Sequence, residues 1–199
     1  MKDLIKMVVV LTVLSSFSGG LLAALRDGTQ ERIEMQELEL VKGPAIRKIL
    51  EGASNDPLTD RFKIQDGNVE RIVFVGVLEG KRNVVVLETA GKGFADKVGL
   101  MVGINADEDK IMSVGVTTHS ETPGLGANAK EDPSFAAQFK GRSLTAAGPI
   151  KVTKDGGDIN ALSGATITSR AVCVAATDAA GIYQRIKPQI TEKLKETSK

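Results

Sequence analysis

The chain has 199 residues, 42% of them hydrophobic and 26% charged, enough for one globular domain with a short additional segment but not for two full domains. Its 26 Lys and Arg residues nearly balance 25 Asp and Glu residues, and the net charge of +1 gives no electrostatic reason to expect a nucleic acid partner. A single Cys and a single His exclude a disulfide framework, a Cys-rich zinc site and a Cys-ligated iron–sulfur cluster within the chain, so we predict no metal site and expect any redox chemistry to need an organic cofactor.

The N-terminal segment, residues 1–25, is predicted to be a membrane anchor. From Leu4 to Leu25 the residues are mostly apolar or small, and as a helix this run would span roughly 33 Å at ~1.5 Å per residue, against about 30 Å for a bilayer core. A cleaved signal peptide is the alternative, with the small residues from Ser15 onward as its cleavage region. We favour the anchor because Leu21 and Leu22 resume the apolar pattern.

The orientation of this anchor is not set by charge, because basic residues precede and follow it in nearly equal number. For one N-terminal span, the simpler topology places the short N-terminus in the cytoplasm and exports the domain that follows. We therefore predict a single-pass protein of the cytoplasmic membrane with its soluble domain on the extracytoplasmic side.

Residues 26–60 are predicted to form a helical connector. Apolar residues fall near helical spacing among charges between Asp27 and Leu50, and Gly43-Pro44 should break this run into two helices. The domain proper is predicted to occupy residues 61–187.

Four segments rich in Val and Ile predict an antiparallel sheet in this domain. They are Val69–Leu78, Asn83–Thr89, Lys97–Asn105 and Lys110–Thr118. The polar turns Glu79–Arg82 and Ala106–Asp109 join successive pairs, and such short connections predict a meander.

The rest of the domain is predicted to be mainly helical. We expect a short helix near Ser134–Lys140, a strand near Ile150–Thr153, and a long last helix with an apolar stripe over Val172–Ile186. Pro188 should bend or stop that helix and leave residues 188–199 as a polar tail. The predicted fold class is α+β, an antiparallel sheet flanked by helices on one side and preceded by one N-terminal transmembrane helix.

The loop from His119 to Gly126 is hard to explain as scaffold alone. It reads H-S-E-T-P-G-L-G, in which the glycines allow close backbone approach and Leu125 offers an apolar face to a flat ligand. An ordinary polar turn after a strand is the alternative interpretation.

The segment from Ser163 to Ser169 is the second candidate. It reads S-G-A-T-I-T-S and opens the last helix, where unpaired backbone N–H groups suit a phosphate. Simple capping of the helix by Thr168 or Ser169 is the alternative. What capping does not account for is the lack of bulk at Gly164-Ala165, where the helix must pack near a loop.

Together the S-G-A-T and H-S-E-T-P-G-L-G segments resemble the FMN-binding domain of the G subunit of the Rnf complex and of the related C subunit of Na⁺-translocating NADH:quinone oxidoreductase. The likeness covers most of the chain, including the N-terminal span and the Gly91–Phe94 turn, and the loop sequence and overall length are more similar to the Rnf protein. The resemblance implies FMN joined by a phosphoester to Thr166, attached by a flavin transferase that uses FAD. The sequence departs from the family's motif at Asn160, where the family has Asp three residues before the Ser.

The resemblance also implies the set of cofactor-binding residues. Besides Thr166, the set comprises Ser163, Gly164, Ala165, Thr168 and Ser169 at the helix start and Glu121, Thr122, Leu125 and Gly126 in the loop. The first group would receive the phosphate and the second would tune the isoalloxazine. No catalytic residue is predicted, because Thr166 only anchors the cofactor.

Three other residues lie in or near these segments. We predict that His119 structures its loop and that Cys173 is a small buried hydrophobe. Arg170 is equally compatible with a phosphate counter-charge and a surface position.

These inferences predict a membrane-anchored electron-transfer subunit that carries covalent FMN. Its complex, as the resemblance implies, couples ferredoxin:NAD⁺ electron transfer to Na⁺ or H⁺ translocation. Such a protein passes electrons between other membrane and peripheral subunits and is not an autonomous enzyme. The alternatives are a stand-alone exported flavoprotein reductase and a non-redox extracytoplasmic adaptor.

Overall fold

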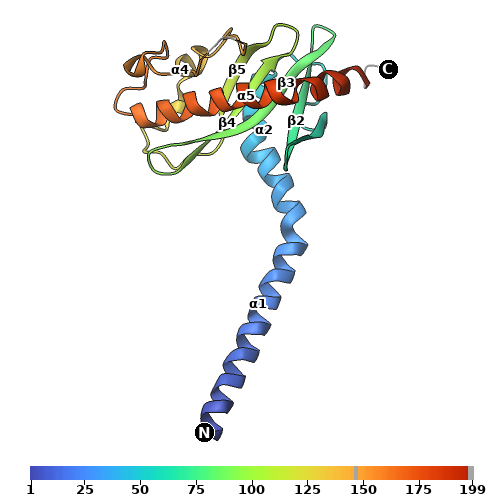
Figure 1. Ribbon diagram of the computed structural model, residues 1–199, viewed down its shortest axis with the longest axis vertical. Coiled ribbons are helices and arrows are strands. Elements are labelled where there is room, and N and C mark those ends of the chain that lie inside the picture. The colour runs from blue at the N-terminus through green and yellow to red at the C-terminus, as the bar shows by residue number, and fades with distance from the viewer. Residues whose placement is uncertain (146–147, 197–199) are drawn as a thin grey trace. The chain divides into compact units, whose positions relative to one another are not determined.

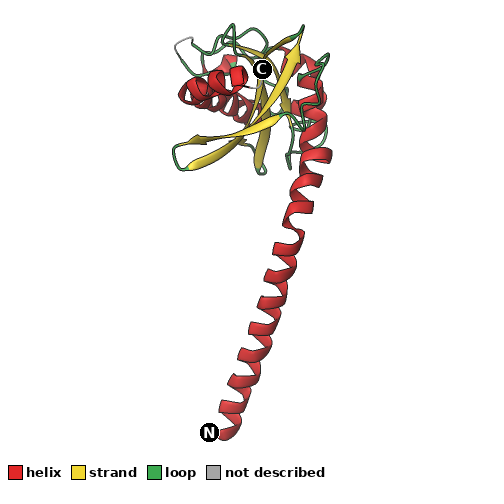
Figure 2. Ribbon diagram, turned by 90° about the vertical axis from the view of Figure 1, so that its right-hand side faces the viewer, coloured by secondary structure: helices red, strands yellow, loops and turns green. Residues whose placement is uncertain are grey.

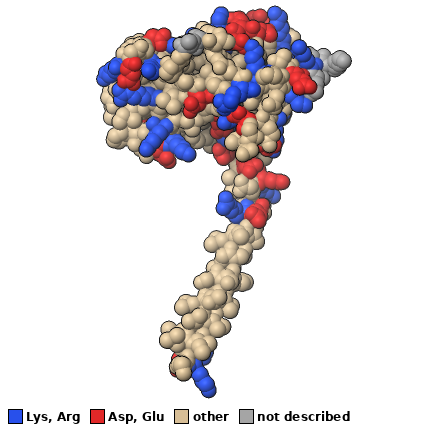
Figure 3. Space-filling model, viewed as in Figure 1, with Lys and Arg blue, Asp and Glu red and all other residues tan. Residues whose placement is uncertain are grey.

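The computed structural model describes residues 1–145 and 148–196 and separates into two compact units, Met1–Glu39 and Leu40–Lys199. Most of the first unit is helix α1 (Lys2–Gln36), none of whose residues is buried. By length and composition this helix can cross a membrane, a test that an N-terminal signal sequence also passes. Figure 3 shows a stretch of this helix without charged side chains, which corresponds to Met7–Leu25.

The predicted break at Gly43-Pro44 is wrong. Helix α1 is followed directly by the π-helical turn η1 (Glu37–Lys42) and by α2 (Gly43–Ile49), so the chain is helical from Lys2 to Ile49. Pro44 lies in the first turn of α2, directly after the π-helical turn, so the lack of a backbone N–H on proline interrupts the α-helical hydrogen-bond pattern without ending the helix.

The second unit is built on a five-stranded antiparallel sheet in the order β1-β2-β3-β4-β5. The strands are β1 (Arg61–Asp66), β2 (Val69–Leu78), β3 (Lys81–Lys92), β4 (Lys97–Asn105) and β5 (Lys110–Val116). The predicted meander is therefore confirmed. Strand β1 was not predicted, because charged residues interrupt it and only Ile64 on it is fully buried.

Helices cover both faces of this sheet, which corrects the expectation that they lie on one side (Figure 2). Helix α5 (Thr166–Glu196) crosses one face, packing on β3 and β4, while α2 lies on the other face against β4 and β5 (Figure 1). The sequence of β3 indicates burial on both faces, because its central Val84–Leu87 run is apolar and does not alternate with polar residues. At Gly103 and Gly115 the missing side chains leave room for Ile49 and Ala45 of α2.

The segment between β5 and α5 is mostly irregular. It contains the short helices α3 (Asn128–Glu131) and α4 (Pro133–Ala137), the second matching the helix predicted near Ser134. The strand predicted over Ile150–Thr153 is wrong. Only Val152 makes a bridge, with Ile159, and the chain then turns through the 3₁₀-helix η2 (Thr153–Asp155).

Helix α5 does not end at Pro188, which corrects another prediction. Pro188 lies inside the helix, which continues to Glu196; residues 197–199 of the predicted tail lie outside the described residues. A proline inside a helix costs about 3 kcal/mol. Beyond it, Ile190 and Leu194 are buried in the main core, and each buried side chain of this kind contributes about 1.5–3 kcal/mol. Core packing thus offsets the local penalty.

Ile190→Ala should lower the free energy of unfolding by about 2–4 kcal/mol, because Ile190 is fully buried and its loss leaves a cavity. Chemical denaturation of the full chain measures the change. Glu192→Ala, exposed on the same turn of helix, is the control and should change it by less than about 0.5 kcal/mol. Equal stability of the two variants would show that the helix is frayed beyond Pro188.

Candidate functional site

The start of α5 and the loop after β5 meet in a pocket of about 390 Å³. Most of the predicted cofactor-binding residues line it: Glu121, Thr122, Leu125, Gly126, Gly164, Ala165, Thr166 and Thr168. The same pocket is lined by Phe94, Lys154 and Ile167, which were not predicted as site residues. The fold therefore brings together two segments about 40 residues apart in sequence, as the family resemblance implied.

Two members of the predicted set do not line this pocket. Ser169 is fully buried; its hydroxyl donates to the Ala165 carbonyl at 2.9 Å and accepts from the Leu162 N–H at 3.0 Å. Ser163 is exposed outside the lining. Ser169 thus ties the helix start to the preceding loop, which is the structural role that capping residues have.

Thr166 is the first residue of α5, and the turn before it is shaped by Gly164. Gly164 has φ +71°, a conformation that favours glycine, and a Cβ there would lie 2.9 Å from Leu125 Cδ2. Within the described residues, no acceptor is found for the N–H groups of residues 166–168. These free donors and the positive end of the helix dipole make this end of the pocket suited to an anion.

Glu121 fastens three segments together. It is 5% exposed; its Oε1 accepts from the Ala95 N–H at 3.0 Å, and its Oε2 accepts from the Thr168 hydroxyl. Burial raises the pKa of Glu121, but the hydrogen bonds from Thr168 and from the backbone of residues 94–96 outweigh it, and the pKa lies below its usual value. The group is therefore a carboxylate at neutral pH and joins the β3–β4 turn to α5.

Gly126 permits this arrangement by its lack of a side chain. A Cβ at Gly126 would lie 2.7 Å from Glu121 Cβ and 2.8 Å from Thr168 Oγ1. Contacts this short do not occur between real Cβ atoms and their neighbours, so any larger residue would push the loop away from α5.

The mouth of the pocket is apolar and open. Phe94 is 72% exposed, Leu125 44% and Ile167 45%. Single exposed apolar side chains are ordinary, but three around one pocket provide faces for a flat aromatic ligand. Phe94 lies in the Gly91–Phe94 turn, which sequence reasoning noted only as part of the resemblance, because an exposed Phe in a hairpin turn has no periodicity to mark it.

Of the two basic residues near Thr166, Arg170 lies outside the pocket and Lys154 lines it. The guanidinium of Arg170 donates two hydrogen bonds of 2.7 Å to the Asp155 carboxylate, so it is engaged in an ion pair and does not line the pocket. Lys154 instead lies with its Nζ 3.4 Å from Thr166 Oγ1. No sequence signal identified Lys154, since it lies 12 residues from Thr166 and directly after the segment predicted as a strand.

The single Cys and the single His lie outside the pocket lining. Cys173 is 2% exposed and burial raises its pKa to about 11, which confirms the prediction of a small buried hydrophobe and argues against a redox thiol. The Nδ1 atom of His119 is buried without a hydrogen-bond partner among the described residues. Its loop-structuring role stays a prediction.

This arrangement fits a flavin mononucleotide. A pocket of about 390 Å³ is within the usual range for small-molecule sites of about 300–1,000 Å³, and it has an apolar mouth and an anion-binding end. Lys154 and the N–H groups of residues 166–168 would hold the phosphate, and the mouth would pack against the isoalloxazine ring. A bound flavin supplies reversible electron transfer.

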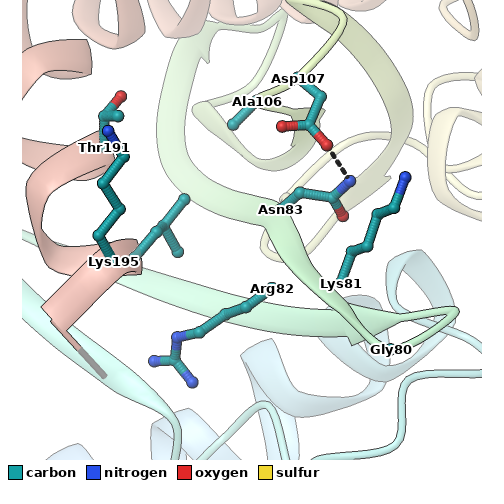
Figure 4. Close-up of a pocket in the computed structure, with 9 residues that line it drawn as sticks. Gly80, Lys81, Arg82, Asn83, Ala106, Asp107, Thr191 and Lys195 are labelled. Atoms are coloured by element: carbon teal, nitrogen blue, oxygen red, sulfur yellow. Dashed lines mark hydrogen bonds between the residues drawn. The ribbon is translucent and has the colours of Figure 1, made fainter. Parts of the chain in front are cut away.

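A second hollow, of about 470 Å³, fits an anionic ligand less well. It is lined by residues of the β2–β3 hairpin, of the β4–β5 turn with Asp107, and of the C-terminal part of α5. The charged ends of Lys81, Arg82 and Lys195 point in different directions (Figure 4). Arg82 is also paired with Asp60 through two hydrogen bonds. This hollow, which an acidic residue also lines, therefore lacks converging donors for an anion.

Comparison with known proteins gives the same picture as the geometry. The model of the FMN-binding domain family matches residues 93–181, which include the β3–β4 turn, the loop of Glu121 and the start of α5. The chain is 35% identical over 174 residues to the G subunit of the ion-translocating oxidoreductase complex of Methanosarcina acetivorans, covering 86% of this chain and 89% of that protein.

Two further similarities extend this result. The G subunit of the proton-translocating ferredoxin:NAD(+) oxidoreductase complex of Clostridium ljungdahlii is 29% identical over 163 residues, covering 81% of this chain and 82% of that protein. The crystal structure of the C subunit of Na(+)-translocating NADH-quinone reductase from Parabacteroides distasonis superposes with a TM-score of 0.52 at 24% identity, covering 59% of this chain and 63% of that one. That likeness, which spans a little under two thirds of the solved chain, confirms the α+β fold.

Proposed function

Since the chain belongs to the G-subunit family of ion-translocating, Rnf-type oxidoreductase complexes, we propose that it is the FMN-carrying electron-transfer subunit of such a complex. The observation that carries the proposal is the pocket at the start of α5, where the predicted residues meet within the family's FMN-binding domain. Electrons pass through the flavin between other subunits in a complex that couples ferredoxin:NAD⁺ electron transfer to ion translocation. Helix α1 fits the role of its membrane anchor.

The finer proposal is that FMN is covalently bound to Thr166 by a phosphoester. Three features support it: Thr166 lines the pocket, the N–H groups of residues 166–168 have no acceptor among the described residues, and the ammonium of Lys154 lies 3.4 Å from the Thr166 hydroxyl. A flavin transferase that uses FAD would attach the group, and the binding set would be the residues that line the pocket. Ser163 and Ser169 are left out of this set, because neither lines it.

Asn160, the departure from the family's motif, lies outside the pocket. It is exposed, and its backbone exchanges hydrogen bonds with the side chain of Gln138, at 2.7 Å from its N–H and 3.3 Å to its carbonyl. Asp158 does not replace the missing acid, because it pairs with Arg142. We propose that position 160 is read by the transferase during docking and does not contact the flavin.

We also propose that the soluble domain lies on the extracytoplasmic side of the cytoplasmic membrane. This orientation follows from the simplest topology of a single N-terminal span. The other subunits of the complex are its partners, and no nucleic acid is expected to bind, in keeping with a net charge of +1.

Inverted membrane vesicles from cells that lack this chain test the function. They should lose ferredoxin-dependent NAD⁺ reduction and the accompanying ion uptake, and the wild-type chain should restore both. The purified chain alone should show neither activity, because its sequence carries no nicotinamide-binding fingerprint. Reduction of ferredoxin or NAD⁺ by the purified chain would favour a stand-alone flavoprotein reductase, and full activity of the depleted vesicles would contradict the proposal.

A further inference from the structure

The turn after Val152 presents a lysine to the proposed attachment point. Lys154 Nζ lies 3.4 Å from Thr166 Oγ1. Among the described residues that line this pocket, Lys154 is the one with a positive charge. We infer that Lys154 binds the phosphate carried by Thr166 and balances its charge during and after attachment. The inference rests on the proposed covalent FMN.

The backbone around Lys154 is held by hydrogen bonds. The Thr153 N–H donates to the Ile159 carbonyl at 2.8 Å, and the Gly157 N–H donates to the Val152 carbonyl at 3.0 Å. Val152 and Ile159 are fully buried in the main core, and Gly156 closes the turn with φ +81°. Lys154 therefore projects from a turn fixed to the core, not from a mobile loop.

A second contact fixes this turn against α5. Arg170, one helical turn after Thr166, donates two hydrogen bonds of 2.7 Å to Asp155. These bonds take up the carboxylate that would otherwise be the natural partner of the adjacent Lys154. The Asp155–Arg170 pair thus both positions Lys154 and leaves its ammonium group for another anion.

The pocket has one other ionised group, and it does not compete for Lys154. Both oxygens of Glu121 accept hydrogen bonds, from Ala95 and from Thr168. A phosphodiester on Thr166 would bring one negative charge beside the free N–H groups of residues 166–168. Lys154 supplies the opposite charge there, and charge-assisted hydrogen bonds are roughly twice as strong as neutral ones.

The same position suits the attachment step. Thr166 Oγ1 forms a bond to the phosphorus of the FMN half of FAD, the pyrophosphate bond to the AMP half breaks, AMP leaves, and the hydroxyl proton passes to a base of the transferase or to solvent. No electron is gained or lost. Because its ammonium group lies 3.4 Å from Thr166 Oγ1, Lys154 would donate to the oxygens of the transferring phosphoryl group, where negative charge develops.

The extent and rate of flavin incorporation test the inference in the full-length chain. Lys154→Met removes the charge and keeps the length of the side chain, Lys154→Arg keeps the charge, and Lys151→Met makes the same change at an exposed lysine outside the pocket lining. Each purified chain is incubated with the flavin transferase and FAD, and its intact mass is followed with time. We expect Lys154→Met to slow incorporation about tenfold or more, with Lys154→Arg and Lys151→Met within about threefold of wild type.

A second measurement separates phosphate binding from recognition by the transferase. Each chain is taken to full modification, and the rise in Tm on flavinylation is measured against its own unmodified form. That rise should fall by at least half in Lys154→Met and should persist in Lys154→Arg. Slower incorporation with an unchanged rise in Tm would assign Lys154 to transferase docking and overturn the inference.

The outcomes distinguish this inference from the proposed function. An unmodified wild-type chain would reject covalent FMN itself. A modified wild-type chain with equal rates and an equal rise in Tm for Lys154→Met would reject the role of Lys154 alone.

Discussion

Thr166→Ala should abolish covalent flavin completely, whereas Thr166→Ser should retain it. Alanine removes the only atom of this side chain that can form the phosphoester, and serine keeps a hydroxyl at the same place at the first residue of α5. Flavin fluorescence in a denaturing gel measures the bound cofactor, and intact mass measures it independently. In the depleted membrane vesicles, Thr166→Ala should fail to restore ferredoxin-dependent NAD⁺ reduction.

A matched control and a Tm comparison show whether a loss of flavin in Thr166→Ala is caused by misfolding. Thr191→Ala makes the same change at an exposed position in the same helix, where the hydroxyl only donates to the Lys187 carbonyl at 2.9 Å, and it should retain full fluorescence. The Tm of unmodified Thr166→Ala should lie within about 2 °C of that of the unmodified wild type, because among the described residues the hydroxyl of Thr166 makes one long hydrogen bond, with Lys154. Fluorescence that survives in Thr166→Ala would place the attachment elsewhere.

The sheet was predictable because its strands are long, apolar and joined by short polar turns. Val69–Leu78 and Lys97–Asn105 were predicted with the bounds that the structure has. Strand β1 was missed because it lies at the edge of the sheet with a single fully buried residue, so that pairing with β2, and not its own pattern, makes it a strand. The continuation of α5 past Pro188 has a similar cause: contacts with distant core residues outweigh a local rule.

The pocket was predictable only in part, for a related reason. Glycines and hydroxyl residues marked the two segments as unusual, whereas the choice of Thr166 as the attachment point came from the family resemblance. Lys154 and Phe94 reach the pocket from turns whose own sequences are ordinary. Their placement depends on how η2 and the β3–β4 turn are fixed, through Asp155 in one case and Glu121 in the other. Such placement is a tertiary property, which one-dimensional patterns do not contain.

Glu121→Gln should lower the free energy of unfolding by about 2–3 kcal/mol. The carboxylate receives donors on both oxygens, from Ala95 and Thr168, whereas an amide can accept on its oxygen only and would turn its NH₂ group toward the other donor. Hydrogen bonds to a buried charged group contribute about 1.5–3 kcal/mol each, and a donor left unpaired adds to the loss. Chemical denaturation of the unmodified chain measures it, with Glu131→Gln, exposed in α3, as a control expected within about 0.5 kcal/mol of wild type.

A double-mutant cycle and a pH series identify the cause of that loss. If Glu121 and Thr168 act through their mutual hydrogen bond, Glu121→Gln and Thr168→Ala together should destabilise less than the sum of the single changes, by about 1–2 kcal/mol. The pKa of Glu121 is lowered in the folded chain, so its contribution is fully present above the unfolded pKa of about 4.3 and is lost as the pH falls through the folded value. The stability difference between wild type and Glu121→Gln should therefore be constant near neutral pH and shrink in acid. A difference that does not change down to the folded pKa, or two additive single effects, would mean that Glu121 acts by filling space and not as the carboxylate that joins the β3–β4 turn to α5.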